Sequence, residues 1–150
     1  MSNESPAEIE RLLVEQAPDA IIFADRNGII RIWNASAERV FGHPAEKAIG
    51  QSLDILIPES LREAHWRGFD RALEAGETKY KGQALPTKSF TADGRDIYVE
   101  LSFGILKDAS GAVIGATAHA RDITERFQQD REMRRELRAL REAAKGAAQS

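Results

Sequence analysis

Residues 20–34 read AIIFADRNGIIRIWN, two apolar runs rich in β-branched residues on either side of a short polar stretch. Asn27 and Gly28, in the middle of that polar stretch, supply the positive φ angles that a tight turn between antiparallel strands requires. The stretch therefore predicts a β-hairpin, with strands at 20–24 and 29–33.

Helical patterns flank this hairpin on both sides. Apolar residues recur at helical spacing between residues 9 and 13 and stop at Pro18, which predicts a short amphipathic helix within residues 1–17. After the hairpin, the positions of Asn, Pro and Gly predict two short helices and a longer one, at 34–41, 44–50 and 59–75.

Beyond Gly76 the periodicity changes from helical to extended, and three strands are expected at 79–91, 96–107 and 112–121. Asp93-Gly94 and the stretch 108–111 mark the turns between them. This order of elements predicts an α+β domain at 18–122: a five-stranded antiparallel sheet with its helices on one face. It also predicts a pocket between the sheet and the longer helix.

After residue 122 the composition shifts to Arg, Glu, Gln, Leu and Ala, so residues 123–150 are expected to form one long helix. Its apolar residues fall at the alternating spacing of a coiled-coil seam, at Met133, Leu137, Leu140 and Ala144. Because the seam is shorter than three heptads, two interpretations stay open. One is a homodimer through the terminal helices, and the other is a single solvated helix.

The composition excludes several functional classes. A net charge of -3 without a clustered basic face gives no reason to expect nucleic acid or an anionic membrane. The absence of cysteine excludes disulfides, thiolate ligands and flavin photochemistry through a thiol adduct. No apolar run approaches the roughly 20 residues that span a bilayer, and the polar start lacks a signal peptide, so a cytoplasmic protein is expected. No paired carboxylates, nucleophile–base set or phosphate loop is present in the sequence, which favours a sensor or binding domain over an enzyme.

Residues 57–71, IPESLREAHWRGFDR, place His65 in the middle of the longer helix with Phe69 one turn further on. Gly68 lies three residues beyond His65 on the same face, although glycine within a helix costs about 1 kcal/mol relative to alanine. A flat, bulky group against this face would account for that glycine, which makes His65 a candidate axial ligand of haem iron. The alternative, and the commoner state of a lone histidine, is a side chain half-buried in an ordinary helix.

The order of elements resembles the PAS domain family over about residues 8–126. The motifs that carry the resemblance are Asp25-Arg26-Asn27-Gly28, Trp33-Asn34, Phe41-Gly42, Ile49-Gly50, Asp93-Gly94 and Arg121-Asp122-Ile123-Thr124-Glu125-Arg126. From Phe41 onward the chain is most similar to haem-binding PAS sensors of the FixL and Dos type. Their Pro-x-x-(Leu/Tyr)-Arg-x-x-His pattern is matched by Pro58, Leu61, Arg62 and His65.

This resemblance implies that His65 is the proximal ligand of a b-type haem. It also implies a domain that detects a diatomic gas (O2, CO or NO) or the redox state of the iron and relays it to a histidine kinase or another output. Arg71 and Lys79 stand where FixL has residues that serve the haem propionates. The remaining residues expected around the cofactor are Gly68, Phe69, Gln83, Leu85, Val99, Leu101, Phe103, Ala118 and Ala120, while His119 is expected to point outward.

The chain departs from these relatives on the side of the haem opposite His65. Leu85 stands where they carry an arginine that hydrogen-bonds bound oxygen, and Gln83 where Dos has a methionine as its alternative sixth ligand. Because a charge-assisted hydrogen bond contributes about 1.5 to 3 kcal/mol, we expect weak or oxidation-prone oxygen binding, with CO or NO binding retained. A haem-free PAS module for dimerisation or for a small organic ligand, with a structural His65, is the alternative function.

Overall fold

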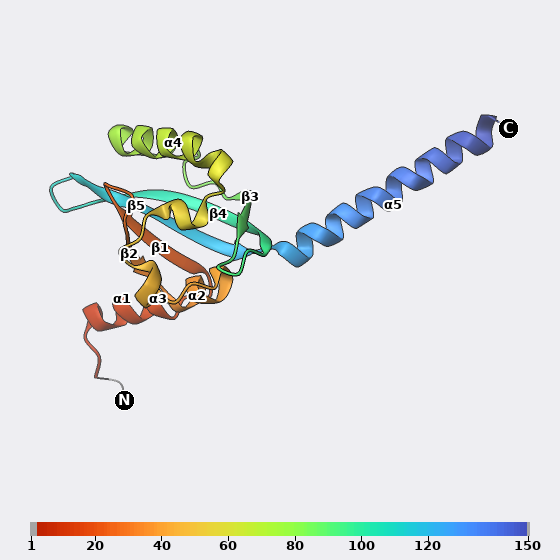
Figure 1. Cartoon of the computed structure of the whole chain (residues 1–150). Helices are drawn as coiled ribbons and strands as arrows, with labels where there is room; N and C mark the ends of the chain where they lie inside the picture. The colour runs from red at the N-terminus through yellow and green to blue at the C-terminus, as the bar shows by residue number, and fades with distance from the viewer. Residues whose placement is uncertain (1–2, 150) are drawn as a thin grey trace.

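Five strands form one antiparallel sheet in the computed structural model, which describes residues 3–149 (Figure 1). The strands lie in the spatial order β2-β1-β5-β4-β3, so the first strand pairs with both the second and the last. Their bounds are β1 Ala20–Asp25, β2 Ile30–Trp33, β3 Leu85–Phe90, β4 Asp96–Lys107 and β5 Val113–Asp122. The predicted α+β fold class with a five-stranded antiparallel sheet is confirmed.

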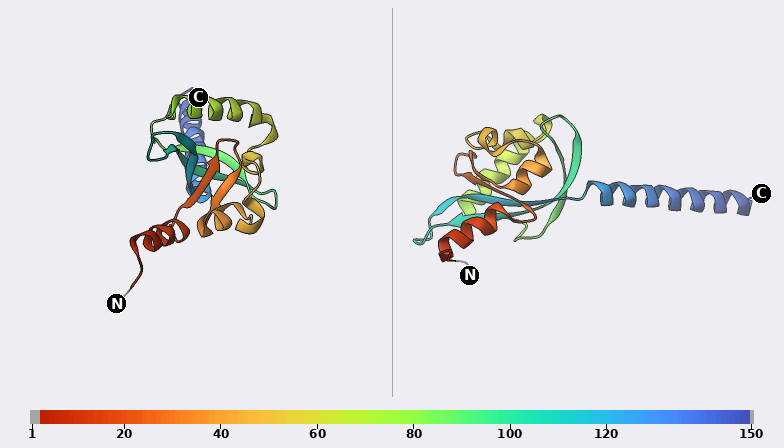
Figure 2. Two further views of the ribbon diagram at one scale, coloured as in Figure 1. Left: turned by 90° about the vertical axis from the view of Figure 1, so that its left-hand side faces the viewer. Right: turned by 90° about the horizontal axis from the view of Figure 1, so that it is seen from below.

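The helices between β2 and β3 gather on one side of the sheet, and the terminal helices lie outside this layer (Figure 2). In chain order the helical elements are α1 Pro6–Glu15, α2 Ala35–Phe41, α3 Ala45–Ala48, the 3-10 helices η1 Leu53–Leu56 and η2 Glu59–Leu61, α4 Arg62–Ala75 and α5 Thr124–Gln149. In the described part of the chain, no helix combines the length and the apolar character that crossing a membrane requires.

The β1–β2 turn is held by the carboxylate of Asp25. Its Oδ1 accepts hydrogen bonds from the backbone N–H groups of Asn27 (2.9 Å) and Ile29 (3.1 Å), and its Oδ2 accepts one from Arg31 Nε (2.8 Å). Burial raises the pKa of Asp25, but the hydrogen bonds from Arg31 and the backbone outweigh it and hold the pKa below its ordinary value. Gly28 completes the turn with a φ of 75°, which confirms the predicted hairpin.

Asn34 joins the hairpin to the helical layer. Its Oδ1 accepts from the N–H groups of Ile21 (2.9 Å) and Ala37 (3.0 Å), so the side chain caps α2 and also contacts β1. Its Nδ2 donates to the carbonyl oxygens of Val14 (2.8 Å) and Asp19 (3.1 Å), which holds the end of α1 in place. One fully buried amide therefore connects three elements.

The core lies between the helical layer and the inner face of the sheet. It consists of small and branched residues from the central strands together with two aromatic rings from β2 and α2: Ala20, Ile22, Ile30, Trp33, Ala37, Phe41, Ala48, Ile97, Val99 and Ala120. Trp33 and Phe41 pack with ring centroids 5.7 Å apart.

The third strand and the longer helix are shorter than predicted. Residues 79–82 form turns, with positive φ at Lys81 (50°) and Gly82 (79°), so the strand expected at 79–91 begins only at Leu85. The cause is local, because the backbone N–H of Gln83 donates to the carbonyl of Tyr80 (3.0 Å) instead of to a neighbouring strand. The helix expected at 59–75 divides into η2 and α4.

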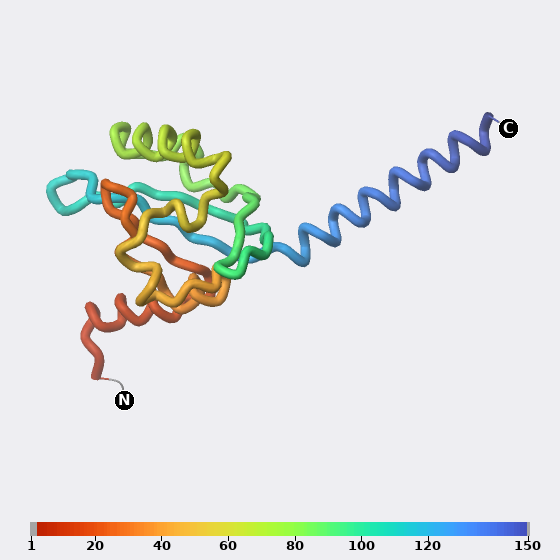
Figure 3. Tube along the Cα trace, viewed as in Figure 1, coloured from red at the N-terminus to blue at the C-terminus, as the bar shows by residue number. Residues whose placement is uncertain are grey.

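The last helix leaves the sheet at the end of β5 and extends away from the domain (Figure 3). The Tyr98 and Phe127 rings stack at 3.9 Å with an interplanar angle of 17°, and the N–H of Ile123 donates to Tyr98 O (2.9 Å), so the start of α5 is fastened to β4. Further along, Met133, Leu137 and Leu140 are 66%, 50% and 68% exposed. The coiled-coil seam is therefore accessible, and the homodimer stays a prediction.

Candidate ligand site around His65

Two close approaches fix the position of α4. A Cβ atom added to Gly28 would lie 2.2 Å from Trp66 Cη2, so the indole of α4 rests directly on the β1–β2 turn. A Cβ added to Gly76, which ends α4, would lie 3.3 Å from Lys107 Nζ, beside the β4–β5 hairpin. The helix that carries His65 therefore crosses the end of the sheet at which both hairpins turn (Figure 1).

His65 is half-buried on α4, and its Nδ1 is buried without a hydrogen-bond partner among the described residues. The imidazole packs against Trp66 (ring centroids 4.8 Å apart, interplanar angle 75°) and Phe69 (6.1 Å, 33°). Burial lowers the pKa of His65 below its ordinary value, and the negative charge of Asp54 opposes part of this effect. A neutral imidazole with an unpaired nitrogen is the form of histidine that binds metals.

Asp54 and Arg62 anchor the start of α4. Asp54 Oδ1 accepts a hydrogen bond from Trp66 Nε1 (2.8 Å). Arg62 donates to the carbonyl oxygens of Ile57 (3.0 Å) and Asp54 (3.2 Å), and its Nε lies 3.9 Å from the Asp54 carboxylate. Sequence reasoning assigned no functional role to Asp54 or Trp66, because the sequence alone gives no sign that these two residues meet.

The sheet residues predicted around the cofactor share one face. In register, Leu101 lies opposite both Leu85 and Ala120, and Phe103 lies opposite Ala118. Together with Val99 these six residues form the apolar inner face of β3, β4 and β5. Val99 and Ala120 are buried in the core, whereas the other four are half-buried. Part of this apolar face therefore remains accessible.

The predicted outward orientation of His119 on β5 is confirmed. His119 pairs with Ser102 on the opposite face of the sheet and is exposed, whereas Ala118 and Ala120 lie on the inner face. His119 is therefore separated from His65 by the sheet, which leaves no sixth-ligand role for it in this arrangement.

Four of the predicted site residues are exposed: Gly68, Arg71, Lys79 and Gln83. Gln83 precedes β3, so it does not belong to a strand, although it lies within the strand expected at 79–91. A Cβ at Gly68 would meet no atom within 4 Å, so no described neighbour requires glycine at this position. Lys79 Nζ lies 5.2 Å from the centroid of the Tyr80 ring. The cofactor roles of all four residues stay predictions.

These residues fit haem better than a bare metal ion. Between residues 3 and 149 there is no group of three or more His, Asp or Glu side chains that could hold a metal ion. Haem brings four nitrogen ligands of its own and needs only one axial side chain, apolar contacts and nearby cations. His65, the half-buried inner face of the sheet and the exposed Arg71 are the residues that would supply them.

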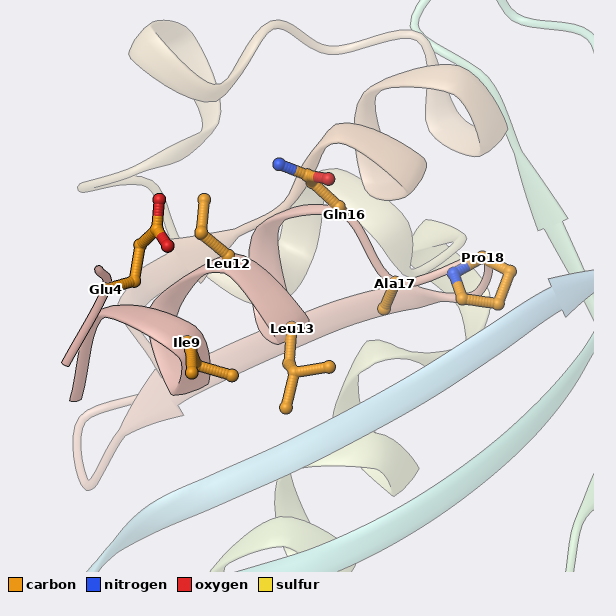
Figure 4. Close-up of a pocket in the computed structure, with 7 residues that line it drawn as sticks. All are labelled: Glu4, Ile9, Leu12, Leu13, Gln16, Ala17 and Pro18. Atoms are coloured by element: carbon orange, nitrogen blue, oxygen red, sulfur yellow. The ribbon is translucent and has the colours of Figure 1, made fainter. Parts of the chain in front are cut away.

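A hollow on the surface lies along α1, at the other end of the domain from α4 (Figures 1 and 4). It is lined by Glu4, Ile9, Leu12, Leu13, Gln16, Ala17 and Pro18. Ile9 and Leu13 are exposed there, so α1 presents apolar side chains to water. This surface is separate from the His65 site.

Comparisons with known proteins identify the family of the chain and several of its relatives. A family model described as PAS fold matches residues 14–128. The sensor protein FixL of Bradyrhizobium diazoefficiens is 33% identical over 118 residues, which cover 79% of this chain and 23% of FixL. The oxygen sensor protein DosP of Escherichia coli is 25% identical over 127 residues, 85% of this chain and 16% of DosP. The signal transduction histidine-protein kinase AtoS, also of Escherichia coli, is 27% identical over 122 residues, 81% of this chain and 19% of AtoS. The chain thus spans less than a quarter of the length of these sensor proteins.

Solved structures support the fold alone. A PAS domain from Colwellia psychrerythraea superposes with a TM-score of 0.70 at 24% identity, over 81% of this chain and 99% of that one. A light-oxygen-voltage domain studied with a flavin analogue superposes with a TM-score of 0.61 at 14% identity, over 88% and 96%. The family match extends over most of the chain and the fold agrees with it. This chain therefore belongs to the PAS family and is a sensor-type domain related to FixL and DosP.

Proposed function

We propose that this domain binds a b-type haem through His65 and senses a diatomic gas or the redox state of the iron. The observations that carry the proposal are the buried and unpaired Nδ1 of His65 on α4 and the half-buried apolar residues on the inner face of β3, β4 and β5. A relative named as an oxygen sensor supports the same conclusion.

Each part of the site has a defined task in this proposal. His65 would bind the iron through its neutral imidazole, and Phe69, Leu101, Phe103 and Ala118 would exclude water from the cofactor. Arg71 and Lys79, both exposed, are the cations proposed for the propionates. When bound, haem supplies reversible ligand exchange and one-electron chemistry at its iron.

Leu85 sets the chemistry proposed for the face opposite His65. It lies on the inner face of β3, opposite Leu101, and it has no hydrogen-bond donor to offer a bound gas. A hydrogen-bond donor at this position would favour oxygen over carbon monoxide, and leucine provides none. We therefore propose weak or oxidation-prone oxygen binding, with carbon monoxide or nitric oxide as the better ligand.

The proposed relay runs along the sheet into α5. The strands that present Leu101, Phe103 and Ala118 are β4 and β5, and both are fastened to the first turn of α5. A shift in their packing therefore acts on the helix that carries the coiled-coil seam. A histidine kinase or another output outside this chain would receive the signal, and the seam and the apolar side of α1 are the surfaces proposed for a homodimer.

Titration with hemin tests the proposal. We expect one equivalent of hemin to bind wild type with a sharp Soret band, and His65→Ala to lose that band. His119→Ala is the matched control, because His119 is an exposed histidine on the other face of the sheet. Equal binding by wild type and His65→Ala would overturn the proposal.

A second candidate function is a haem-free dimerisation module, favoured by the exposed apolar residues of α1 and α5. Sedimentation of the haem-free protein tests it. This candidate would be supported over the first if the protein does not bind hemin and forms a dimer that Leu137→Asp and Leu13→Asp disrupt.

A further inference from the structure

We propose that Trp66 and Asp54 are positioning residues that hold the His65 imidazole in place by fastening α4 to two other elements. We call Trp66, Asp54 and Gly28 the Trp66 lock. The inference rests on the proposed function for what His65 binds, whereas the lock itself is a property of the haem-free protein.

The hydrogen bond of the lock gives the helix a defined rotation. Trp66 follows His65 directly, so any rotation of α4 about its axis moves the two rings together. The indole Nε1 donates to Asp54 Oδ1 at 2.8 Å, which ties the ring to η1. The same indole meets the imidazole edge to face, with centroids 4.8 Å apart. Fixing the indole therefore fixes one side of the imidazole.

The contact with Gly28 supplies the second attachment. The space that a Cβ of Gly28 would occupy is filled by the Trp66 ring, at 2.2 Å and 2.3 Å from Cη2 and Cζ3. The turn and η1 are also joined directly, because Leu53 N donates to Gly28 O at 3.0 Å. Three segments far apart in the sequence, at residues 28, 54 and 66, thus form one connected unit beside His65.

The chemistry of the lock suits positioning more than bulk stability. The Asp54 side chain is 41% exposed, so water competes for its hydrogen bond and limits the net contribution of that bond to about a tenfold change in an equilibrium constant. A phenylalanine at position 66 would keep an aromatic ring beside His65, but it would lack the Nε1 donor and the far edge of the indole that reaches Gly28. What the indole adds is a directional bond to a carboxylate, and a directional bond specifies orientation.

Trp33 provides the matched control. Its Nε1 also makes one hydrogen bond of 2.8 Å, to the carbonyl of His43, but it lies in the core against Phe41. Trp66→Phe and Trp33→Phe therefore delete the same chemical group from two different places. Only the deletion at Trp66 is expected to change the surroundings of His65.

The first readout needs no haem. Hydrogen exchange of the α4 amides in the haem-free protein should become about tenfold faster in Trp66→Phe, the effect of losing one hydrogen bond to a charged group that is partly exposed. It should stay at the wild-type rate in Trp33→Phe. Asp54→Asn keeps an oxygen acceptor and should behave like wild type, whereas Asp54→Leu should match Trp66→Phe.

The second readout uses the hemin complex. Hemin should dissociate about tenfold faster from Trp66→Phe and Asp54→Leu, with a shifted Soret band, and at the wild-type rate from Trp33→Phe and Asp54→Asn. Equal α4 exchange in wild type, Trp66→Phe and Trp33→Phe would overturn the lock. Absence of hemin binding in wild type would overturn the proposed function alone, because the exchange measurement still decides whether the lock exists. Normal hemin release from Trp66→Phe, with faster α4 exchange, would overturn the positioning role.

Discussion

Replacing Gly28 by alanine drives a methyl group into the Trp66 ring. The new Cβ would lie 2.2 Å from Cη2, about 1.2 Å closer than the 3.4 Å at which ordinary contacts begin. Moving the indole away from the new methyl group would break its 2.8 Å hydrogen bond to Asp54. The substitution therefore tests whether α4 rests on the β1–β2 turn.

A matched substitution separates this clash from backbone strain. Gly28 and Gly94 both occupy tight turns, with φ of 75° and 82°, and a Cβ at Gly94 would meet nothing within 4 Å. At either position alanine costs about 1–2 kcal/mol for the left-handed conformation. Only at Gly28 is overpacking added, at about 1–3 kcal/mol. We therefore expect Gly94→Ala to lower the free energy of unfolding by about 1–2 kcal/mol and Gly28→Ala by about 2–5 kcal/mol.

Urea unfolding of the haem-free protein, followed by far-UV circular dichroism, measures both values. In a Trp66→Ala background the ring is gone, so the extra loss at Gly28 should disappear and the two glycine substitutions should become equal. Equal losses at Gly28 and Gly94 in the wild-type background would refute the contact between α4 and the turn. So would an extra loss at Gly28 that persists without Trp66.

Three further predictions concern other parts of the domain. Leu85→Arg should tighten oxygen binding by the ferrous haem complex about ten- to a hundredfold and slow its oxidation, by supplying a charge-assisted hydrogen bond; an unchanged oxygen affinity would contradict the role given to Leu85. Because the folded protein lowers the pKa of Asp25, its stabilisation is present above the ordinary carboxyl pKa of about 3.9 and is lost as the pH falls through the lower folded value. Asp25→Asn should therefore be less stable than wild type in urea at neutral pH, and the difference should vanish in strong acid; a difference independent of pH would exclude this origin. Phe127→Ala removes a stacked pair worth about 0.5–1.5 kcal/mol beyond its buried area and should speed amide exchange in the first turn of α5. Met133→Ala, further along the helix and exposed, should leave that exchange unchanged. Equal effects of Phe127→Ala and Met133→Ala on the exchange would argue against the stacked Tyr98–Phe127 pair as the attachment of α5.

The features that the sequence predicted correctly depend on local chemistry. The β1–β2 hairpin follows from Asn27 and Gly28, whose conformational preferences act within four residues. Val99, Leu101 and Phe103 alternate along β4 and therefore share one face, whereas the outward orientation of His119 on β5 was implied by the resemblance to the PAS family. Neither inference required knowledge of the tertiary structure.

The features that sequence reasoning missed depend on competing local hydrogen bonds or on contacts between residues far apart in the chain. Residues 79–82 were expected to begin a strand, but they form turns with their own hydrogen bonds, so Gln83 lies outside β3. The Trp66 lock joins residues separated by 26 and 12 positions in the chain. Gly28 was predicted as a turn glycine, and its second role, the close contact with the Trp66 ring, becomes visible only in three dimensions.

The exposed residues of the candidate site show a further limit of sequence reasoning. Gly68 was singled out because a glycine within a helix is unfavourable, but the surrounding protein leaves the position open. The free-energy cost of a glycine within a helix therefore identifies an unusual residue, but it does not identify the group that makes the glycine necessary. A ligand that lies against α4 is the explanation that the proposed function offers.

The absorption spectrum of the purified protein, with and without hemin, is the most direct test of His65 as an iron ligand. Wild type should acquire a Soret band, His65→Gly should lose it, and added imidazole should restore it by filling the space of the missing side chain. A spectrum that is unchanged by His65→Gly, or a wild-type protein without a Soret band when hemin is abundant, would contradict the central claim.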